Sequence, residues 1–298
     1  MPSQDNHVKG LALSAIGGMA ITLDIPLIKL AAGETWSILL ARSAMTLGVG
    51  LAVWLIWRAF DKKAPALIPG REGLIVAALY GLSSIFFVIS VFNTSTANLV
   101  FILALNTMFS ALLGWIFLKE RPRFGTMIAM SAMVVGVLII VWDSIGTGNI
   151  IGDLAALVST LSIAAAITLS RATGKDMGLA SLVGVALPML LAAAMVGQNG
   201  FRIDVPWWVV LDGAIFIPIA FFCLATGPKY ISGPEVAMFY LLETVLTPIW
   251  VWMIFAETPT RNSLIGGAIL IVALLAHSIW QLVSGRRRRA TGVMRHPG

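Results

Sequence analysis

The chain has 298 residues, of which 58% are hydrophobic and only 11% are charged, and its formal net charge is +6. Ordinary soluble domains contain roughly 25% charged residues, so this composition excludes a soluble globular protein and predicts an integral membrane protein. None of the patterns H-E-x-x-H, C-x-x-C, G-x-S-x-G or a nucleotide-binding P-loop occurs in the sequence. We therefore expect no metal site, no cofactor and no enzymatic activity.

Ten stretches of the sequence are long and apolar enough to cross the hydrocarbon layer as helices. In chain order they are residues 9–30, 35–57, 72–92, 96–118, 124–142, 150–171, 178–197, 207–226, 234–255 and 263–283. The first contains Asp24 and Pro26, and the sixth is rich in small and hydroxylated residues, but both are compatible with helices packed inside a bundle. The predicted fold class is therefore an all-α integral membrane protein with ten transmembrane helices.

The basic residues are distributed unevenly between the two sides of these spans. If the N-terminus is cytoplasmic, sixteen of the 20 Lys and Arg residues flank the cytoplasmic side, and Lys29, Arg202 and Arg261 flank the outer side. Cytoplasmic loops of membrane proteins are enriched in Lys and Arg. We therefore expect a multi-pass protein of a bacterial-type cytoplasmic (inner) membrane with both termini in the cytoplasm. The basic segment GRRRRATGVMRHPG follows the last span closely, so we interpret it as a topology signal that attracts anionic lipid, and not as a nucleic-acid-binding tail.

The sequence repeats itself at an offset of 137 positions, which aligns residues 74–138 with 211–275 without a gap. The pattern W-x4-E-x-P recurs at this offset, in WIFLKERP and WMIFAETP. It pairs Trp115 with Trp252, Glu120 with Glu257 and Pro122 with Pro259. We predict two five-helix repeats, residues 1–145 and 146–290, followed by a cytoplasmic tail, residues 291–298. Because five is odd, the repeats must be inverted relative to each other, as in carriers with a site near the midplane.

Two segments resemble a known family: NTMFSALLGWIFLKERP, which closes span four, and ETVLTPIWVWMIFAETP, which closes span nine. They are similar to the EamA-type carriers of the drug/metabolite transporter superfamily, and the resemblance covers nearly the whole chain. We favour the branch of the aromatic amino-acid exporters. The resemblance implies proton- or gradient-linked movement of small metabolites, often amino-acid export, through a cavity lined by spans one, three, four, six, eight and nine. Span four of the family commonly has a proline where this chain reads NTMF, residues 106–109.

Glu243 and Asn106 are the main candidates for a substrate-binding site. Span nine is centred near residue 244 and span four near residue 107, so the repeat places the two side chains at equal depth. Polar stripes at helical spacing accompany them: Tyr240, Thr244 and Thr247 on span nine, and Thr107 and Ser110 on span four. Glu243 could carry a coupling proton, because a carboxyl group in an apolar environment keeps its proton more readily. It could also neutralise a cationic group of the substrate, or it could be a structural glutamate bonded to a neighbouring helix.

Further candidates lie on spans one, two and three. Tyr80, Ser83 and Phe87 could line the same site. Asp24 and Arg42 each lie about seven residues from the outer ends of their spans, or ~10 Å at 1.5 Å per residue, so they can pair across adjacent antiparallel helices. We expect an ion pair that makes both charges tolerable, and the alternatives are a clamp for a substrate carboxylate or an outer gate. Pro26 should free a backbone carbonyl or bend the first span.

These features predict a secondary transporter that exports small metabolites, with amino acids or related zwitterions and amines as the favoured substrates. The alternative is a drug or cation efflux carrier, or an uptake carrier of another metabolite class. A channel or a membrane enzyme fits less well, because neither a ring of charges nor a catalytic motif is visible. The expected partners are a small-molecule substrate, the lipid bilayer and protons, without nucleic acid, and the expected state is a monomer.

Overall fold

The computed structural model describes residues 4–60, 66–122, 124–173, 177–226, 230–231 and 233–293. Within these ranges the chain is almost entirely helical, and its one β-type contact is an isolated bridge between Gly33 and Ile203. Part of the predicted basic set lies outside the described residues, as do residues 294–298 of the predicted tail. These basic residues are Lys62, Lys63, Arg123, Lys175, Lys229 and Arg295.

Ten helical segments of the described chain are long and apolar enough to cross a membrane, which confirms the predicted all-α fold with ten spans. Six spans are single helices: α3 (Thr35–Phe60), α4 (Gly70–Asn93), α7 (Phe124–Thr147), α8 (Ile150–Thr173), α13 (Gly233–Phe255) and α14 (Arg261–Val293). Each of the other four consists of shorter helices in succession. They are α1 (Gln4–Ile21) with α2 (Asp24–Leu30), α5 (Thr96–Leu103) with α6 (Asn106–Leu118), α9 (Gly178–Gly184) with α10 (Ala186–Asn199), and α11 (Pro206–Leu211) with the π-helix η1 (Asp212–Phe216) and α12 (Ile217–Thr226).

The helix boundaries repeat at the same offset as the sequence. Helix α13 begins at the position equivalent to the start of α5 and ends at the position equivalent to the end of α6, and α14 begins at the equivalent of the start of α7. Lys119 and Ala256, which directly follow α6 and α13, have positive φ angles of 58° and 53°. This left-handed conformation is costly for residues with a Cβ atom, so its recurrence indicates the same chain reversal in both repeats. The two five-helix repeats are inverted, because each has an odd number of spans.

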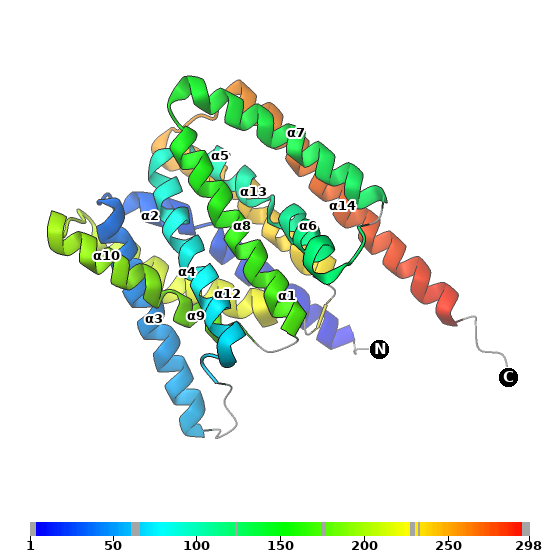
Figure 1. The fold of residues 1–298 in the computed structure, drawn as a ribbon, viewed down its shortest axis with the longest axis horizontal. Helices are drawn as coiled ribbons and strands as arrows, with labels where there is room; N and C mark the ends of the chain where they lie inside the picture. The colour runs from blue at the N-terminus through cyan, green and yellow to red at the C-terminus, as the bar shows by residue number, and fades with distance from the viewer. Residues whose placement is uncertain are drawn as a thin grey trace.

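The helices pack as one bundle with a pair of spans at either edge. Helix α4 packs along α8, and α1 packs against α12 and α13. Helix α7 lies beside α14 at one edge, and α3 lies beside α10 at the other (Figure 1). Gly136 and Gly266 allow α7 and α14 to approach closely, because a Cβ on either would lie only 2.8 or 2.5 Å from the carbonyl oxygen of the other.

The bundle has two faces that differ in how their loops are joined. Helix α1 begins and α14 ends on the same face, which we call the terminal face, and the other is the opposite face. At the opposite face, Glu34 donates its amide N–H to the carbonyl of Arg202 (3.1 Å), and Val205 donates to the carbonyl of Ala31 (3.0 Å). These bonds join the connection between spans one and two to the connection between spans seven and eight.

Candidate functional site

Span one is interrupted beside a predicted site residue. Helix α1 ends at Ile21, and α2 begins at Asp24. Pro26 has no N–H group and cannot bond to the carbonyl of Thr22, four residues earlier. That carbonyl instead accepts a hydrogen bond from Thr247 Oγ1 (3.1 Å). The prediction that Pro26 frees a carbonyl in span one is confirmed, and the freed group joins span one to span nine.

Span four is interrupted between Leu103 and Asn106, although no proline stands there. Leu105 donates its N–H to the carbonyl of Ile102 (3.0 Å), a 3₁₀-type bond that closes the turn. Such turns inside a helix often mark a functional hinge. The interruption makes Asn106 the first residue of α6, at the positive end of a helix dipole. Because the first amide groups of a helix have no intrahelical partner, this helix start can receive an anionic group within the bundle.

Glu243 lies at the middle of α13, the continuous counterpart of α5 and α6. Its side chain is half-buried, and within the described part of the chain it forms no side-chain hydrogen bond or ion pair. Asp24 repels it electrostatically, and Glu243 in turn acts on Tyr240, which is also within electrostatic range of Tyr80 on α4. Glu243 is therefore within electrostatic range of Asp24 on span one, and its carboxyl group has no side-chain partner in the described part of the chain.

Exposure along the polar stripe of α13 falls from the terminal face toward the opposite face. Tyr240 is 44% exposed and Glu243 is half-buried, whereas Thr244 is 6% exposed and Thr247 is fully buried. Near the opposite face α13 packs on α5, whereas α6 packs on α8. The stripe is therefore packed in its half nearer the opposite face and accessible in the half nearer the terminal face.

The predicted residues on spans three and four have different surroundings. Asn106 and Ser110 are half-buried, with Ser110 Oγ 3.5 Å from Asn106 Oδ1. Thr107 is exposed and donates a hydrogen bond to a carbonyl of its own turn (3.2 Å). Ser83 is buried, and its Oγ lies 2.9 Å from Oγ of Ser159 on α8. In this conformation Ser83 joins spans three and six, and Asn106 and Ser110 form the polar stripe of span four.

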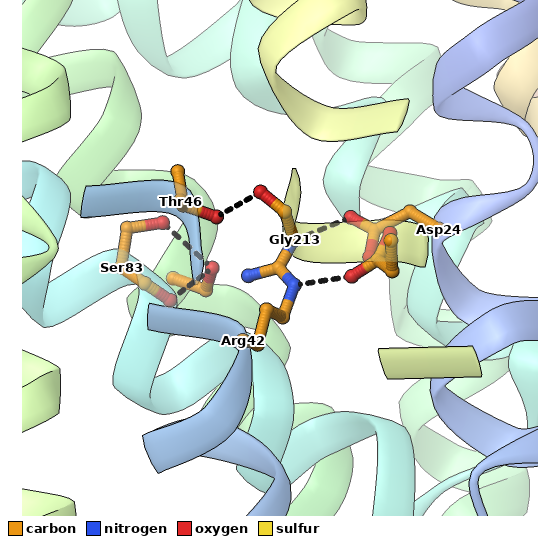
Figure 2. A network of polar contacts seen from close by, with 7 residues as sticks. Asp24, Arg42, Thr46, Ser83 and Gly213 are labelled. Atoms are coloured by element: carbon orange, nitrogen blue, oxygen red, sulfur yellow. Dashed lines mark hydrogen bonds and ion pairs between the residues drawn. The ribbon is translucent and has the colours of Figure 1, made fainter. Parts of the chain in front are cut away.

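Arg42 on α3 forms ion pairs with two buried aspartates, whose carboxylates lie on the same side of its guanidinium (Figure 2). Its Nη2 donates to Asp24 Oδ2 (2.7 Å), and its Nε donates to Asp212 Oδ2 (2.9 Å). Asp24 is 5% exposed, Arg42 is 8% exposed and Asp212 is fully buried. The guanidinium also lies over the ring of Phe87, 5.4 Å from its centroid, in a cation–π contact. The two residues that the sequence suggested as a pair thus belong to a triad, and Phe87 covers its arginine.

The third member of the triad, Asp212, was missed by the sequence analysis. It begins the π-helix η1, in which the N–H of Ile217 bonds to the carbonyl of Asp212. The adjacent Gly213 lets α3 come close, because a Cβ there would lie 2.7 Å from the carbonyl oxygen of Arg42. The carbonyl of Gly213 accepts a hydrogen bond from Thr46 Oγ1 (3.0 Å; Figure 2). The available signal was an acidic residue inside span eight, because such residues are rare and usually paired.

The repeated glutamates join neighbouring spans where spans four and nine end. At the opposite face, Glu257 forms an ion pair with Lys29 of α2 and accepts the amide N–H of Thr96 (2.6 Å). At the terminal face, Glu120 pairs with Arg171 of α8 (2.7 Å). The side chains of Glu257 and Lys29 are 27% and 18% exposed, against 52% and 49% for Glu120 and Arg171. The joint at the opposite face is therefore the better shielded of the two.

A second polar cluster strengthens the opposite face. Asp153 of α8 accepts hydrogen bonds from the hydroxyl groups of Thr94 and Ser144. Asn98 donates to Ser144 Oγ (3.0 Å) and accepts a hydrogen bond from Ser263 of α14. The cluster connects spans four, five, six and ten with the turn between spans three and four, so these elements are held together at this face.

A family comparison decides the affiliation of the chain. The model of the EamA-like transporter family matches residues 8–142 and 150–279. This chain belongs to the EamA-like transporter family. The family pattern thus occurs twice in the EamA-like chain, once over the spans of each five-helix repeat.

Comparisons with individual proteins give one transporter relative and one solved structure of the same fold. "Uncharacterized transporter sll1164" of Synechocystis sp. (strain ATCC 27184 / PCC 6803 / Kazusa) is 24% identical to the EamA-like chain over 219 residues. The match covers 67% of this chain but 62% of that relative, which is less than two thirds of the relative's length. A solved protein crystal structure aligns with a TM-score of 0.62 at 14% identity, over 92% of this chain and 98% of its own. At that identity the likeness shows a shared fold alone.

Proposed function

We propose that this EamA-like protein is a secondary transporter that exports a small zwitterionic metabolite, such as an amino acid, by alternating access around Glu243 and Asn106. Glu243 carries the proposal, because it is a half-buried carboxylate at the middle of a span with no side-chain partner in the described part of the chain. An ionisable group at this depth is costly and is usually retained for function. The ammonium group of a substrate would be its missing partner.

The start of α6 supports a substrate that also has a negative charge. Asn106 begins this helix at the position equivalent to Glu243 in the other repeat. The positive end of the helix dipole, the first amide groups and the Asn106 amide favour a carboxylate. A zwitterion would thus find an acidic group on span nine and an anion-binding helix start on span four. Export, rather than uptake, rests on the resemblance to amino-acid exporters.

The difference between the two faces supports alternating access. The opposite face is closed by joined loops, by Glu257 and by the cluster around Asp153. Toward the terminal face, the polar stripe of α13 becomes more exposed, up to Tyr240. A carrier that presents its site to one side at a time requires such an arrangement, and inverted repeats allow the opposite arrangement to form from the same contacts.

We also place the protein in a bacterial-type cytoplasmic membrane as a monomer, with both termini in the cytoplasm. The excess of Lys and Arg on the terminal side supports this orientation. The conformation described above would then be inward-facing. Labelling of an Ala290→Cys variant by a membrane-impermeant reagent added from outside the cell would refute this orientation.

Counterflow in proteoliposomes tests the proposed function against panels of amino acids, amines and nucleotide-like metabolites. We expect amino acids to be carried. Glu243→Gln should raise their half-saturation concentration about 10- to 100-fold, since a hydrogen bond to a charged group contributes about 1.5–3 kcal/mol. Glu235→Gln is the matched control, because it makes the same change nearer the start of α13, where Glu235 lies 3.2 Å from the ring of His7. This control should transport as the wild type does.

Other outcomes would change the proposal in defined ways. Transport of hydrophobic cations that is insensitive to Asn106→Ala would favour the alternative, a drug or cation carrier. Wild-type transport of amino acids by Glu243→Gln would make Glu243 a structural glutamate. If no member of any panel is carried, the transport proposal fails.

A further inference from the structure

The Asp24–Arg42–Asp212 triad contains more carboxylate oxygens than its arginine satisfies. Both aspartates bond to Arg42 through Oδ2, and among the described residues the Oδ1 atom of each is buried without a hydrogen-bond donor. The side chains of Asp24 and Arg42 are 6% and 10% exposed, and that of Asp212 is 0% exposed. Buried carboxylate oxygens without partners are costly. The two Oδ1 atoms could therefore bind an additional proton or cation.

The net charge of the triad favours a proton as the bound species. With both aspartates ionised, two negative charges face one guanidinium, and the site has a net charge of −1 in an apolar environment. A single proton removes the excess charge, and the protonated carboxyl group becomes a hydrogen-bond donor. Two carboxylates that share one site cannot both ionise readily, so the proton is held by the pair and not by either residue alone.

Among the described residues, the elements packed against the triad offer no competing cation at this depth. Glu243 on α13 is within electrostatic range of Asp24, but it is also acidic. Lys29, on the same helix as Asp24, forms its ion pair with Glu257 at the opposite face. The other titratable groups on the elements packed against the triad are Arg58 on α3, Arg71, Glu72 and Tyr80 on α4, Cys223 on α12, and Glu235 and Tyr240 on α13. Arg58 and Arg71 lie at the ends of their helices nearest the terminal face.

A proton also fits the triad better than a metal ion does. Hard cations take six or more oxygen ligands, whereas the triad offers two unpartnered carboxylate oxygens. No group of three or more His, Cys, Asp or Glu side chains suitable for a metal occurs among the described residues. The guanidinium of Arg42, which bonds to both carboxylates, would repel a metal cation that entered.

We infer that Asp24 and Asp212 share one exchangeable proton beside Arg42, and that this pair is the proton-coupling site of the transporter. The coupling role rests on the proposed transport function. The triad joins spans one, two and eight, and Asp24 directly follows the break in span one. Movement of α2 relative to η1 would part the carboxylates, admit water and release the proton to it. Glu243 then remains available to the substrate while the triad carries the coupling ion.

Infrared difference spectroscopy of the whole protein in lipid tests the proton site without any substrate. Across the neutral pH range, protein with ¹³C-labelled aspartate should lose the C=O band of one protonated aspartic acid, and the isotope shift separates this band from that of Glu243. Asp24→Asn and Asp212→Asn should each lack the band, because Arg42 neutralises the aspartate that remains. Asp204→Asn, at a loop position where the side chain is 57% exposed, should retain it.

Three results would overturn the proton site. They are the absence of a protonated aspartate in the wild type at neutral pH, its persistence in both Asn variants, and its removal by Na⁺ at constant pH. The two single variants should fold, because each leaves a neutral ion pair, whereas the double variant strands the Arg42 charge and should melt at a lower temperature than either. If the double variant melts at the same temperature as the single variants, Arg42 does not need a carboxylate partner. That result would contradict the proposed charges of the triad.

A transport measurement tests coupling separately. In vesicles with an imposed pH gradient, accumulation of substrate by Asp212→Asn should fall to the level reached without a gradient, and Asp204→Asn should accumulate it as the wild type does. Accumulation by Asp212→Asn at the wild-type level would overturn the coupling role. A protein that shows the aspartic acid band but carries no substrate would keep the proton site and refute the transport function.

Discussion

Glu120 and Glu257 are equivalent residues of the two repeats, yet their surroundings differ. Each is preceded by a residue with left-handed backbone, and each pairs with a basic residue of a neighbouring span. Glu257 is shielded and also holds the amide of Thr96, whereas Glu120 and its partner Arg171 are about half exposed. Because the repeats are inverted, equivalent contacts lie on opposite faces, and the better shielded contact lies at the opposite face, the one that we propose to be closed.

The comparison predicts how the molecule would change in a second conformation. In a carrier built from inverted repeats, the two repeats exchange conformations when access changes sides. Glu120 should then become the shielded glutamate and Glu257 the exposed one. Substitutions that weaken one face should therefore shift the population of the two states, and equivalent substitutions at the other face should not have the same effect.

The largest loss of stability is expected from Gly152→Ala, which disrupts the packing of helix α8 at the opposite face. A Cβ at Gly152 would lie 2.3 Å from the backbone carbonyl carbon of Asn93. Because backbone cannot yield as a flexible side chain does, we expect a loss of stability of about 3 kcal/mol, seen as a lower Tm in detergent. Gly146→Ala is the control, since no atom outside the adjacent backbone of its own helix lies within 4 Å of the added methyl group. An unchanged Tm for Gly152→Ala would contradict this packing.

Glu257→Ala should open the same face without disrupting the fold. It removes the ion pair with Lys29 and a bond to Thr96, which together stabilise the closed face by about 1–2 kcal/mol, or a 5- to 30-fold change in population. Val251→Cys, at a position 1% exposed on α13, the helix that ends just before Glu257, is a suitable reporter in a Cys223→Ser background. Its labelling from the opposite side should accelerate by this factor, and an unchanged rate would argue that Glu257 does not hold the face closed.

Thr247→Val should have a smaller effect in the same labelling assay. The substitution keeps the shape of the side chain but leaves the carbonyl of Thr22 without its partner. The expected cost is about 1 kcal/mol, which corresponds to about a fivefold faster reaction of the Val251→Cys reporter. If labelling is unaffected, the bond between spans one and nine does not contribute to closure.

The smallest effect is expected from Glu120→Ala, the equivalent of Glu257→Ala. Its pair with Arg171 is exposed, and exposed pairs contribute about 0–1 kcal/mol. Labelling of the Val251→Cys reporter should therefore stay within about fivefold of the unaltered protein, and any change should be a decrease. If the labelling rate rises as much as in Glu257→Ala, the ion pairs at the two faces stabilise this conformation equally. The proposed difference between the two faces would then be wrong.

The spans and the repeat were readable from sequence because they depend on apolar length and on one constant offset. The predicted fourth span, residues 96–118, coincides with α5 and α6 from Thr96 to Leu118. The last helix continues to Val293, well beyond the predicted end of the span at residue 283, because apolar length marks the membrane crossing and not the end of the helix. The repeat offset is also what placed Asn106 and Glu243 at equivalent positions.

The details of the candidate site could not be read in the same way. The break in span four contains no proline, so the sequence gives no signal for it. The 3₁₀-type bond of Leu105 that closes the break is seen only in the structure. Asp212 lies 170 positions from Arg42, and no local pattern links the two. Pro26 was different, because the loss of one N–H group has a consequence that can be located by counting four residues back to Thr22.

The π-helical turn in span eight determines the direction in which Asp212 projects from the helix. Each residue of an α-helix turns the chain by about 100°, and η1 accommodates one residue more than an α-helical turn would. Deleting one residue from 213–216 would restore α-helical register and swing Asp212 about 100° around the helix, away from Arg42, with no change of its chemical identity. In this span the placement of a charge is determined by the number of residues in a single turn.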